Sequence, residues 1–383
     1  MPRPSSLNPW IFPMLHRPPF LAMMAAALTL FSACAPFESP KPKAPDVAPQ
    51  PSRPSQHLTG DAGGAYRAQK LTGDFRGYPA AEAFIDRMVD QEGFSRDYLY
   101  GLLSQAKRKT WTIEYMNREK PTVKQKPGGW TRYRAKFLDD RHIGAGTQFW
   151  NRHAEALKRA EATYGVSPEV VLGIMGVETI YGANVGTHRV IDALTTLAFD
   201  YPRRAAYFES ELESLLIMAR QEGLDPSKPV GSFAGAMGLG QFMPSSFLKY
   251  AVDFDGNGRV DLWDPEDAIG SIAHYFASFG WKSGEPVVAN ARVMGLEAES
   301  LKSGFDTRYT FEDLAARGIR PEGRAAMDGE VSFLVLSTLQ GNDYRIGYPN
   351  FYVITRYNHS TYYAMAVYEL GQAIRERRQG LGR

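Results

Sequence analysis

One carboxylate, Glu178, stands near the end of an apolar stretch and is the best candidate for acid–base chemistry in the chain. Ser167 is a suitable N-cap and Pro168 suits the first helical position, so the stretch is predicted to be a helix. Steps of three and four residues put Glu178 on one helical face with Val171, Ile174 and Tyr181. Poor solvation on such a face raises the pKa of a carboxyl group, as a general acid near neutral pH requires. A structural carboxylate held by an arginine or a hydroxyl group fits the same pattern.

A glycine-rich stretch follows at residues 231–246 (GSFAGAMGLGQFMPSS). Glycines and small residues at this density indicate close approach of backbones and unusual dihedral angles. The order of residues matches neither a Walker loop nor a nucleophile elbow, which argues against phosphate binding and serine hydrolysis. A ligand that runs along exposed backbone fits the stretch, with Gln241 and Ser232 as polar contacts. A tight packing turn between helices explains it equally well.

Residues 253–264 (DFDGNGRVDLWD) have the spacing of an EF-hand-like calcium loop. Gly258 stands at the sharp-turn position six and Val260 at the hydrophobic position eight, with helical sequence on both sides. The backbone carbonyl of Arg259 can serve as a further ligand. Oxygen ligands stand at positions one, three, five and nine: Asp253, Asp255, Asn257 and Asp261.

The closing position of this loop departs from the pattern, because it holds Asp264 instead of glutamate. Asp264 with Pro265 is also a good N-cap and first-turn pair. Asp267, one turn into the following helix, is therefore the better closing carboxylate. A single loop outside the cytosol is typical of a structural clamp with a dissociation constant of about 10⁻⁴–10⁻³ M. The predicted cofactor is a structural Ca²⁺ ion, with the ligands Asp253, Asp255, Asn257, Arg259 and Asp267.

Aromatic and polar groups gather in two further places. Residues 130–134 (WTRYR) mix rings with basic groups, as carbohydrate and peptide clefts do, although ordinary surfaces also carry such residues. Near the C-terminus, residues 351–358 are predicted to form a β-strand, and Ser360 to cap a helix over residues 362–375. Tyr357, Asn358 and Tyr363 then meet at one junction. By itself, such a junction is more typical of aromatic core packing than of a site.

The elements that must position these residues are mostly helical. The spacing of apolar residues predicts helices over residues 80–89, 96–106, 149–164, 190–197, 203–222, 244–252 and 265–279, with a loop over 120–130. From residue 286 to 339 the pattern loosens into short β-like runs with glycine and proline between them. We therefore predict an α+β fold that is mainly α and contains a small β-containing subdomain.

The composition is that of an ordinary globular protein: 383 residues, of which 44% are hydrophobic and 22% charged. The formal net charge is only +2, and no stripe of lysine and arginine interleaved with aromatic residues is present. These observations argue against nucleic acid as a partner.

The first residues of the chain resemble an export signal. Basic residues precede an apolar run at residues 21–33 that is too short for a stable membrane anchor. Cys34, the only cysteine of the chain, follows at once, so it cannot form an internal disulfide. Either this is a secretory signal with an incidental cysteine, or it is a bacterial lipoprotein signal that is cut before a lipidated Cys34. Residues 31–34 (FSAC) resemble a lipobox, with Phe31 where leucine is usual.

The proline-rich segment from Pro36 to Pro54 has the composition of an extended tether between a membrane anchor and a folded part that begins near residues 75–80. Ala35 stands after the cysteine, where lipoproteins kept in the inner membrane have aspartate. We therefore expect an outer-membrane lipoprotein that faces the periplasm of a Gram-negative bacterium.

Taken together, these motifs resemble the lysozyme-like lytic transglycosylase family. The resemblance runs from about Trp130 to the C-terminus and is weaker before it. It is carried by residues 177–182 (VETIYG), by residues 235–246, by the loop at Asp253 and by residues 356–360 (RYNHS). It implies a lysozyme-like catalytic core and cleavage of the β-1,4 bond between N-acetylmuramic acid and N-acetylglucosamine in peptidoglycan glycan strands, with a 1,6-anhydro product.

The resemblance also implies roles for individual residues. Glu178 would act first as acid and then as base, so that no second catalytic carboxylate is needed, whereas ordinary glycosidases use two. The calcium loop belongs to the family pattern. Cleft-lining positions match Ser232, Gln241, Tyr357, Asn358 and Tyr363, and saccharide-contacting rings match Tyr133 and Tyr275.

Two other functions remain open. A lysozyme-type hydrolase would need a second carboxylate near Glu178, for which Asp192 is the nearest downstream candidate. A peptidoglycan-binding lipoprotein without catalysis would need no acid. The sequence gives no sign of protein partners such as cell-wall enzyme complexes. The predicted organisation is a signal (1–33), a tether (34–74), an N-terminal helical region (75–145), a catalytic core (146–285), a β-containing subdomain (286–340) and a C-terminal segment that completes the core (341–383).

Overall fold

The computed structural model describes residues 60–118, 127–295, 297–323 and 328–380. The expected signal, the lipidated Cys34 and the proline-rich tether as far as residue 59 lie outside the described residues. Within the described part, no helix is both long enough and apolar enough to cross a membrane.

The packed part of the chain begins earlier than the sequence pattern predicts. Tyr66 and Leu71 are buried in the core, and the Tyr66 hydroxyl donates a hydrogen bond of 2.7 Å to Asp225. The predicted start near residues 75–80 is therefore too late. Isolated apolar residues between polar ones give no periodic signal, so only the tertiary contacts identify this segment as packed.

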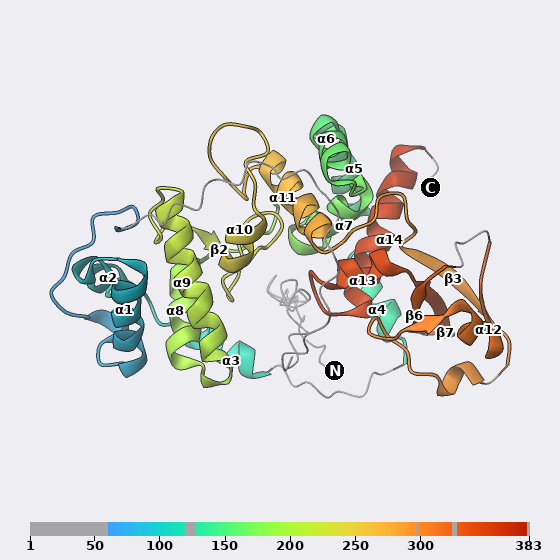
Figure 1. Cartoon of the computed structure of the whole chain (residues 1–383), viewed down its shortest axis with the longest axis horizontal. Coiled ribbons are helices and arrows are strands. Elements are labelled where there is room, and N and C mark those ends of the chain that lie inside the picture. Colours follow the sequence, from blue (N-terminus) through green and yellow to red (C-terminus); the bar gives the residue numbers. More distant parts are fainter. Residues whose placement is uncertain (1–59, 119–126, 296, 324–327, 381–383) are drawn as a thin grey trace, which may run out of the picture.

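Helices make up most of the molecule, and a sheet lies at one end (Figure 1). The helices of the first half are α1 (Pro79–Glu92), α2 (Arg96–Leu103), α3 (Thr110–Arg118), α4 (Gly129–Arg134), α5 (Asp140–Arg152), α6 (Ala154–Tyr164), α7 (Pro168–Thr179) and α8 (Val190–Asp200). The later ones are α9 (Ala205–Gln221), α10 (Pro244–Tyr250), α11 (Pro265–Ser278), α12 (Phe311–Ala316), α13 (Pro349–Thr355) and α14 (Thr361–Arg378). The predominance of helix agrees with the predicted fold class.

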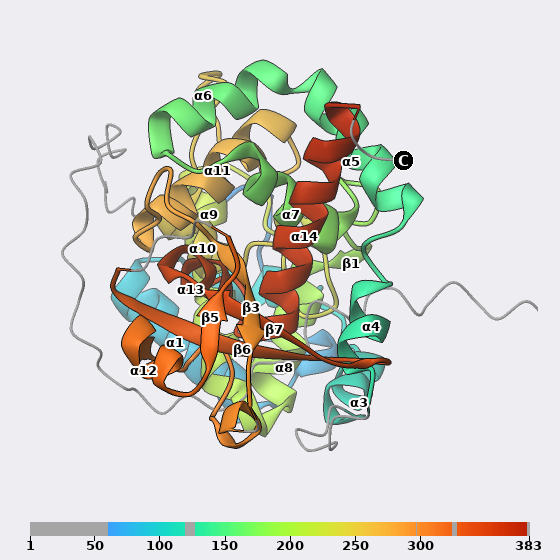
Figure 2. The ribbon, with the colours of Figure 1, turned by 90° about the vertical axis from the view of Figure 1, so that its right-hand side faces the viewer.

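Helix α7 is the centre of the helical part and packs along α14 (Figure 2). Nearly all its residues are buried, so it is apolar around its whole circumference and not along a single stripe. Gly173 permits the close approach, because a Cβ there would lie 2.2 Å from the carbonyl oxygen of Val367. The helix ends at Thr179, so Tyr181 does not continue its face as the spacing predicts.

The strands of the small sheet are β3 (Val288–Val293), β4 (Tyr309–Thr310), β5 (Ile319–Pro321), β6 (Glu330–Thr338) and β7 (Gly341–Gly347). This five-stranded sheet is antiparallel throughout, with the order β4-β6-β7-β3-β5. Its central pair is a hairpin in which Ser332 faces Gly347 and Thr338 faces Gly341. A separate two-stranded ribbon joins β1 (His188–Arg189) to β2 (Val230–Gly231).

Three sequence-based predictions about these elements are wrong. The helix predicted over 149–164 is two helices, which meet at His153. The predicted boundary at residue 340 cuts the hairpin of β6 and β7. The strand predicted over 351–358 is helix α13, which begins at Pro349 and buries Phe351, Val353 and Ile354. Packing of that apolar face overrides the β-propensity of the residues, and a proline at the first helical position is the signal that was missed.

Candidate active site

Glu178 lies one residue before the end of α7, and its side chain is half-buried. The Tyr363 hydroxyl, from α14, donates a hydrogen bond of 2.5 Å to Oε1 of Glu178. Burial raises the pKa of Glu178 to about 7, and the Tyr363 hydrogen bond opposes part of this rise. Near neutral pH both the acid and the carboxylate are therefore populated, so the group can give up a proton and take one back.

Two further tyrosines face this carboxyl group. Burial raises the pKa of Tyr133 and of Tyr357, and the negative charge of Glu178 raises both further. Tyr133 comes from α4, and Tyr357 from the turn after α13. Together with Tyr363, they place three rings from three separate elements around a single acid.

The hydroxyl groups of Tyr357 and Tyr275 fix backbone atoms. Tyr357 donates to the carbonyl oxygen of Gly240 at 2.6 Å, and Tyr275 donates to that of Arg356 at 2.7 Å. The two rings are in edge contact, with centroids 4.9 Å apart. Tyr275 is only 8% exposed, so it orders the Tyr357 turn more than it offers a free surface. Asn358 is half-buried in the same turn.

The glycine-rich loop is folded by its own hydrogen bonds. Gln241 donates through Nε2 to the carbonyl oxygens of Gly238 (2.9 Å) and Val185 (3.2 Å). Oγ of Ser232 is buried and accepts from the backbone N–H of Ala236 at 3.0 Å. Gly238 has φ = 69°, and a Cβ there would lie 2.4 Å from Leu262. Both the close packing and the unusual dihedral angles predicted for this loop are present.

Thr179 connects the acid helix to this loop, a link that the sequence analysis did not identify. Its buried hydroxyl donates to the carbonyl oxygen of Leu239 at 2.9 Å and accepts from the N–H of Gly182 at 3.1 Å. The residue after Glu178 is thereby bonded to the residue before Gly240, which accepts from Tyr357. Only the threonine's place beside a candidate acid hinted at this role.

Backbone strain is concentrated at the end of α7 and in the glycine-rich loop. In the described parts of the chain, the only non-glycine residues with positive φ are Ile180 (52°), Tyr181 (55°) and Gln241 (55°). Such dihedral angles cost about 1–3 kcal/mol each and persist where the surroundings impose them, often at functional sites. A β-branched residue such as Ile180 is particularly unsuited to this region.

No second carboxyl group shifts the pKa of Glu178 among the residues that the structure describes, where only burial and Tyr363 do so. Asp192, the candidate considered from the sequence, is buried. It accepts from the backbone N–H of Lys107 at 2.9 Å and lies 3.2 Å from Nζ of Lys109. These bonds hold Asp192 in a structural ion pair on α8.

The predicted calcium loop brings three carboxylates together. Oxygen atoms of Asp253, Asp255 and Asp267 lie within 4.8 Å of one another. Asp267 is fully buried; burial raises its pKa, and backbone N–H groups of Asp261, Phe254 and Asp255 lower it. Carboxylate oxygens at this spacing suit a hard cation such as Ca²⁺, which would offset their mutual repulsion.

Two other polar residues of the calcium loop make hydrogen bonds to the backbone: Asp264 caps a helix, and Asn257 stabilises a turn. Asp264 accepts from the N–H groups of Glu266 (2.7 Å) and Asp267 (3.4 Å), so it is the N-cap of α11. Asp267, and not Asp264, joins the carboxylate cluster. Asn257 accepts through Oδ1 from the N–H of Arg259 at 2.9 Å. The backbone carbonyl of Arg259 is the group that the loop pattern assigns to a cation.

Comparison with known proteins identifies the family to which this arrangement belongs. Residues 77–372 match the family described as Transglycosylase SLT domain. The chain belongs to this family. A curated relative, the membrane-bound lytic murein transglycosylase B of Escherichia coli (strain K12), is 49% identical over 314 residues, which are 81% of this chain and 86% of the relative. The chain is thus a lytic transglycosylase that acts on peptidoglycan.

Solved structures of other lytic transglycosylases agree with the assignment of this chain to the family. The E. coli lytic transglycosylase Slt35, in a complex with bulgecin A and in another with calcium, is 49% identical with a TM-score of 0.77; the match covers 81% of this chain and 97% of Slt35. SltB3 of Pseudomonas aeruginosa, in complex with NAG-anhNAM-pentapeptide, is 28% identical with a TM-score of 0.69, over 77% of this chain and 78% of SltB3. These likenesses support the lysozyme-like character of the core.

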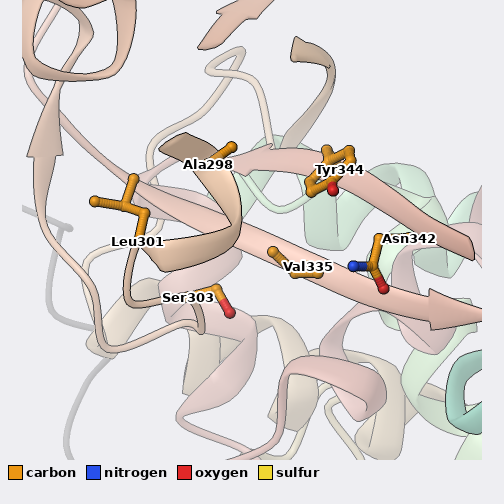
Figure 3. Close-up of a pocket in the computed structure, with 6 residues that line it drawn as sticks. All are labelled: Ala298, Leu301, Ser303, Val335, Asn342 and Tyr344. Atoms are coloured by element: carbon orange, nitrogen blue, oxygen red, sulfur yellow. The ribbon is translucent and has the colours of Figure 1, made fainter. Parts of the chain in front are cut away.

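A cavity of about 360 Å³ lies elsewhere in the transglycosylase, at the β6–β7 hairpin (Figure 3). It is lined by Ala298, Leu301, Ser303, Val335, Asn342 and Tyr344. Among the described residues that line it, none carries a carboxyl group and none belongs to the surroundings of Glu178. Volume alone does not make it the active site, because proton transfer to a glycosidic oxygen needs an acid such as Glu178.

Proposed function

We propose that this transglycosylase cleaves the β-1,4 bond between N-acetylmuramic acid and N-acetylglucosamine, with Glu178 as the only catalytic carboxyl group. The observation that carries the proposal is a half-buried acid with a pKa of about 7, whose pKa no second carboxyl group shifts among the described residues. A hydrolase of the two-carboxylate type needs a partner acid at this place.

The proton balance of the reaction suits one residue. Glu178 donates its proton to the glycosidic oxygen while the bond from that oxygen to C1 of muramic acid breaks. The C6 hydroxyl of the same sugar then forms a bond to C1, and its proton passes to the carboxylate of Glu178. The acid is regenerated and no water is consumed. The 2-acetamido group of the substrate stabilises the positive charge that develops at C1.

In this proposal the tyrosines orient the acid and bind sugar rings, and the glycine-rich loop binds the glycan strand. Tyr363 orients the carboxyl group through its 2.5 Å hydrogen bond and stabilises the anion that exists between the two proton transfers. Tyr133, Tyr357 and Asn358 line the cleft for the sugar rings, with Tyr275 behind Tyr357. The glycine-rich loop, with Ser232 and Gln241, presents its backbone to the glycan strand.

A digestion of purified murein followed by mass spectrometry tests this proposal. The native protein is expected to release muropeptides with 1,6-anhydromuramic acid ends, and Glu178→Gln to release none while it keeps its circular dichroism spectrum. Glu376→Gln, at an exposed glutamate of α14, is the matched control and should retain activity. Products heavier by one water would show hydrolysis instead, and activity in Glu178→Gln would remove Glu178 from the mechanism.

We further propose that the loop at Asp253 holds a structural Ca²⁺ ion through Asp253, Asp255, Asn257, the carbonyl of Arg259 and Asp267. The carboxylate cluster supports this proposal, as does the calcium complex of Slt35. Ca²⁺ should raise the melting temperature of the native protein, and Asp253→Ala should abolish the rise. A native protein that melts at the same temperature with Ca²⁺ and with a chelator would rule the site out.

We also propose that the protein is tethered to the outer membrane through a lipid on Cys34 and faces the periplasm. The lipobox-like residues 31–34 and the name of the membrane-bound E. coli relative support this location. Cell fractionation tests it: the native protein should sediment with outer membranes, and Cys34→Ala should be released as a soluble protein. Native protein found wholly in the soluble periplasmic fraction would contradict the tether.

A further inference from the structure

The geometry points to an additional sugar-binding subsite, beyond the cleft at Glu178, on a surface where three aromatic rings pack over a buried fourth. This inference rests on the proposed function, because the ligand is the same glycan strand. We call the surface the Trp111 patch; it consists of Trp111, Tyr115, His188 and Phe233.

The rings of the Trp111 patch are in direct contact. The Trp111 ring is stacked with Tyr115 (centroids 5.2 Å apart, 27° between planes) and with His188 (5.9 Å, 9°). Phe233 meets both from below, edge-on, at 5.7 Å from Trp111 and 4.7 Å from Tyr115. Trp111 and Tyr115 are one turn apart on α3, so helical spacing sets their alignment. The patch is therefore ordered before any ligand arrives.

Exposure distinguishes this patch from core packing. Phe233 is 1% exposed and fills the interior, whereas Trp111 is 40% exposed. In the described residues, four large apolar side chains are exposed: Trp111, Val230, Met294 and Leu339. Val230 belongs to β2 of the β1–β2 ribbon, and Trp111 stacks on His188 of β1, which pairs with Gly231. A large exposed ring held by ordered neighbours is a feature of binding surfaces.

The glycine-rich loop links the Trp111 patch to the surroundings of Glu178. His188 lies ten positions after Glu178, so the two are at most about 35 Å apart. Between them, Val185 accepts a hydrogen bond from Gln241 of the glycine-rich loop. At the far end, Phe233 directly follows Ser232 in that loop. A long glycan strand that passes along the loop from Glu178 therefore leads toward the Trp111 patch, and Figure 1 shows α3 next to α8.

The chemistry of the Trp111 patch matches a sugar ring. An amino sugar has apolar C–H faces that pack on aromatic rings and a rim of hydroxyl and acetamido oxygens that accept hydrogen bonds. Trp111 supplies both a ring and an indole N–H donor. Lys109 and Arg189, which flank the patch and pair with the buried Asp192, are each about one-third exposed and make the surroundings positive. An uncharged or anionic glycan is therefore accepted and a cationic ligand disfavoured.

Binding of glycan fragments of graded length tests the inference. Affinities are measured in the Glu178→Gln background, which prevents cleavage, for short fragments confined to the Glu178 cleft and for long peptide-free strands. Trp111→Ala should reduce the ratio of long-strand to short-fragment affinity about tenfold, the effect of losing one stacked ring. Trp111→Phe should recover most of the ratio, and Met294→Ala, at an exposed apolar residue of the β subdomain, should leave it unchanged.

The possible outcomes distinguish a failure of the proposed subsite from a failure of the proposed function. An unchanged ratio in Trp111→Ala overturns the subsite, as does an equal loss for short and long strands, which would mean that the ring only supports the loop at Ser232. A change in sedimentation coefficient caused by Trp111→Ala alone would make the patch a contact between copies of the chain, and would also overturn it. Cleavage of murein by the native protein is measured before the affinity ratios. If the native protein cleaves no murein, the proposed function fails, whatever the ratios show.

Discussion

Replacing Glu178 with glutamine should stabilise the protein at alkaline pH while it removes activity. The folded state holds the proton of Glu178 up to pH about 7, whereas the unfolded chain releases it near the ordinary value of 4.5. Above pH 7 both states are ionised, and the folded protein bears the cost of a poorly solvated carboxylate. As the pH falls from about 7 to 4.5, the folded state takes up the proton first and gains stability.

The size of this effect follows from the pKa difference. A shift of about 2.5 units corresponds to about 3 kcal/mol, which partial solvent access to the side chain reduces to about 2 kcal/mol. Glutamine has the same shape, does not ionise, and can accept the Tyr363 hydrogen bond through its amide oxygen. The free energy of unfolding of Glu178→Gln should therefore exceed that of the native protein by about 2 kcal/mol at pH 8.5, and by much less near pH 4.5.

Urea denaturation followed by circular dichroism, at a series of pH values from about 4.5 to 8.5, measures this difference. Glu376→Gln, which changes an exposed glutamate, should show no trend of this kind. A difference between Glu178→Gln and the native protein that is constant with pH, or that grows as the pH falls, would refute the reasoning. It would mean that burial does not hold the acid in its neutral form.

Three further experiments, each with its own variants, test the surroundings of the acid and the proposed cation site. Tyr363→Phe removes the donor that favours the carboxylate, so the pKa of Glu178 should rise and the alkaline limb of the pH–rate profile should move up by about one unit; a limb that stays in place or moves down contradicts this role. Thr179→Val should lower kcat about tenfold with little change in KM, and Thr179→Ser should restore it; equal loss in both variants would make the methyl group, and not the hydroxyl group, responsible. Asp267→Asn should abolish the Ca²⁺-dependent rise in melting temperature, whereas Asp264→Asn should lower stability but keep the rise; the opposite result would exchange the two assignments.

The sequence predicts those parts of the site that depend on residues close together in the chain. Glu178 near a helix end, the spacing of the carboxylates at Asp253 and the N-cap at Ser360 depend on neighbours a few residues apart. The family resemblance added Tyr133 and Tyr363, and both interact with Glu178 in the structure. These residues cluster because of the fold. The family resemblance implied that fold, whereas the periodicity of apolar residues predicted only individual helices.

What the sequence did not reveal depends on contacts between distant segments. The partner of Thr179 is a carbonyl group 60 residues away, and no residue type marks a backbone acceptor. Helix α13 has strand-forming residues but becomes helical because its apolar face packs on α14. The left-handed dihedral angles at Ile180 and Tyr181 contradict the preferences of both residues, and only the surrounding bonds impose them.

The bond between Glu178 and Tyr363 joins residues that are 185 positions apart. During synthesis the acid therefore leaves the ribosome long before the helix that supplies its hydrogen-bond donor. A chain that is released or cut before Tyr363 has Glu178 without its donor and α7 without the partner that buries it, and the exposed apolar helix makes such a fragment prone to aggregation. Since α14 packs on α7 and supplies the donor to Glu178, the proposed acid site is complete only after synthesis has passed α14.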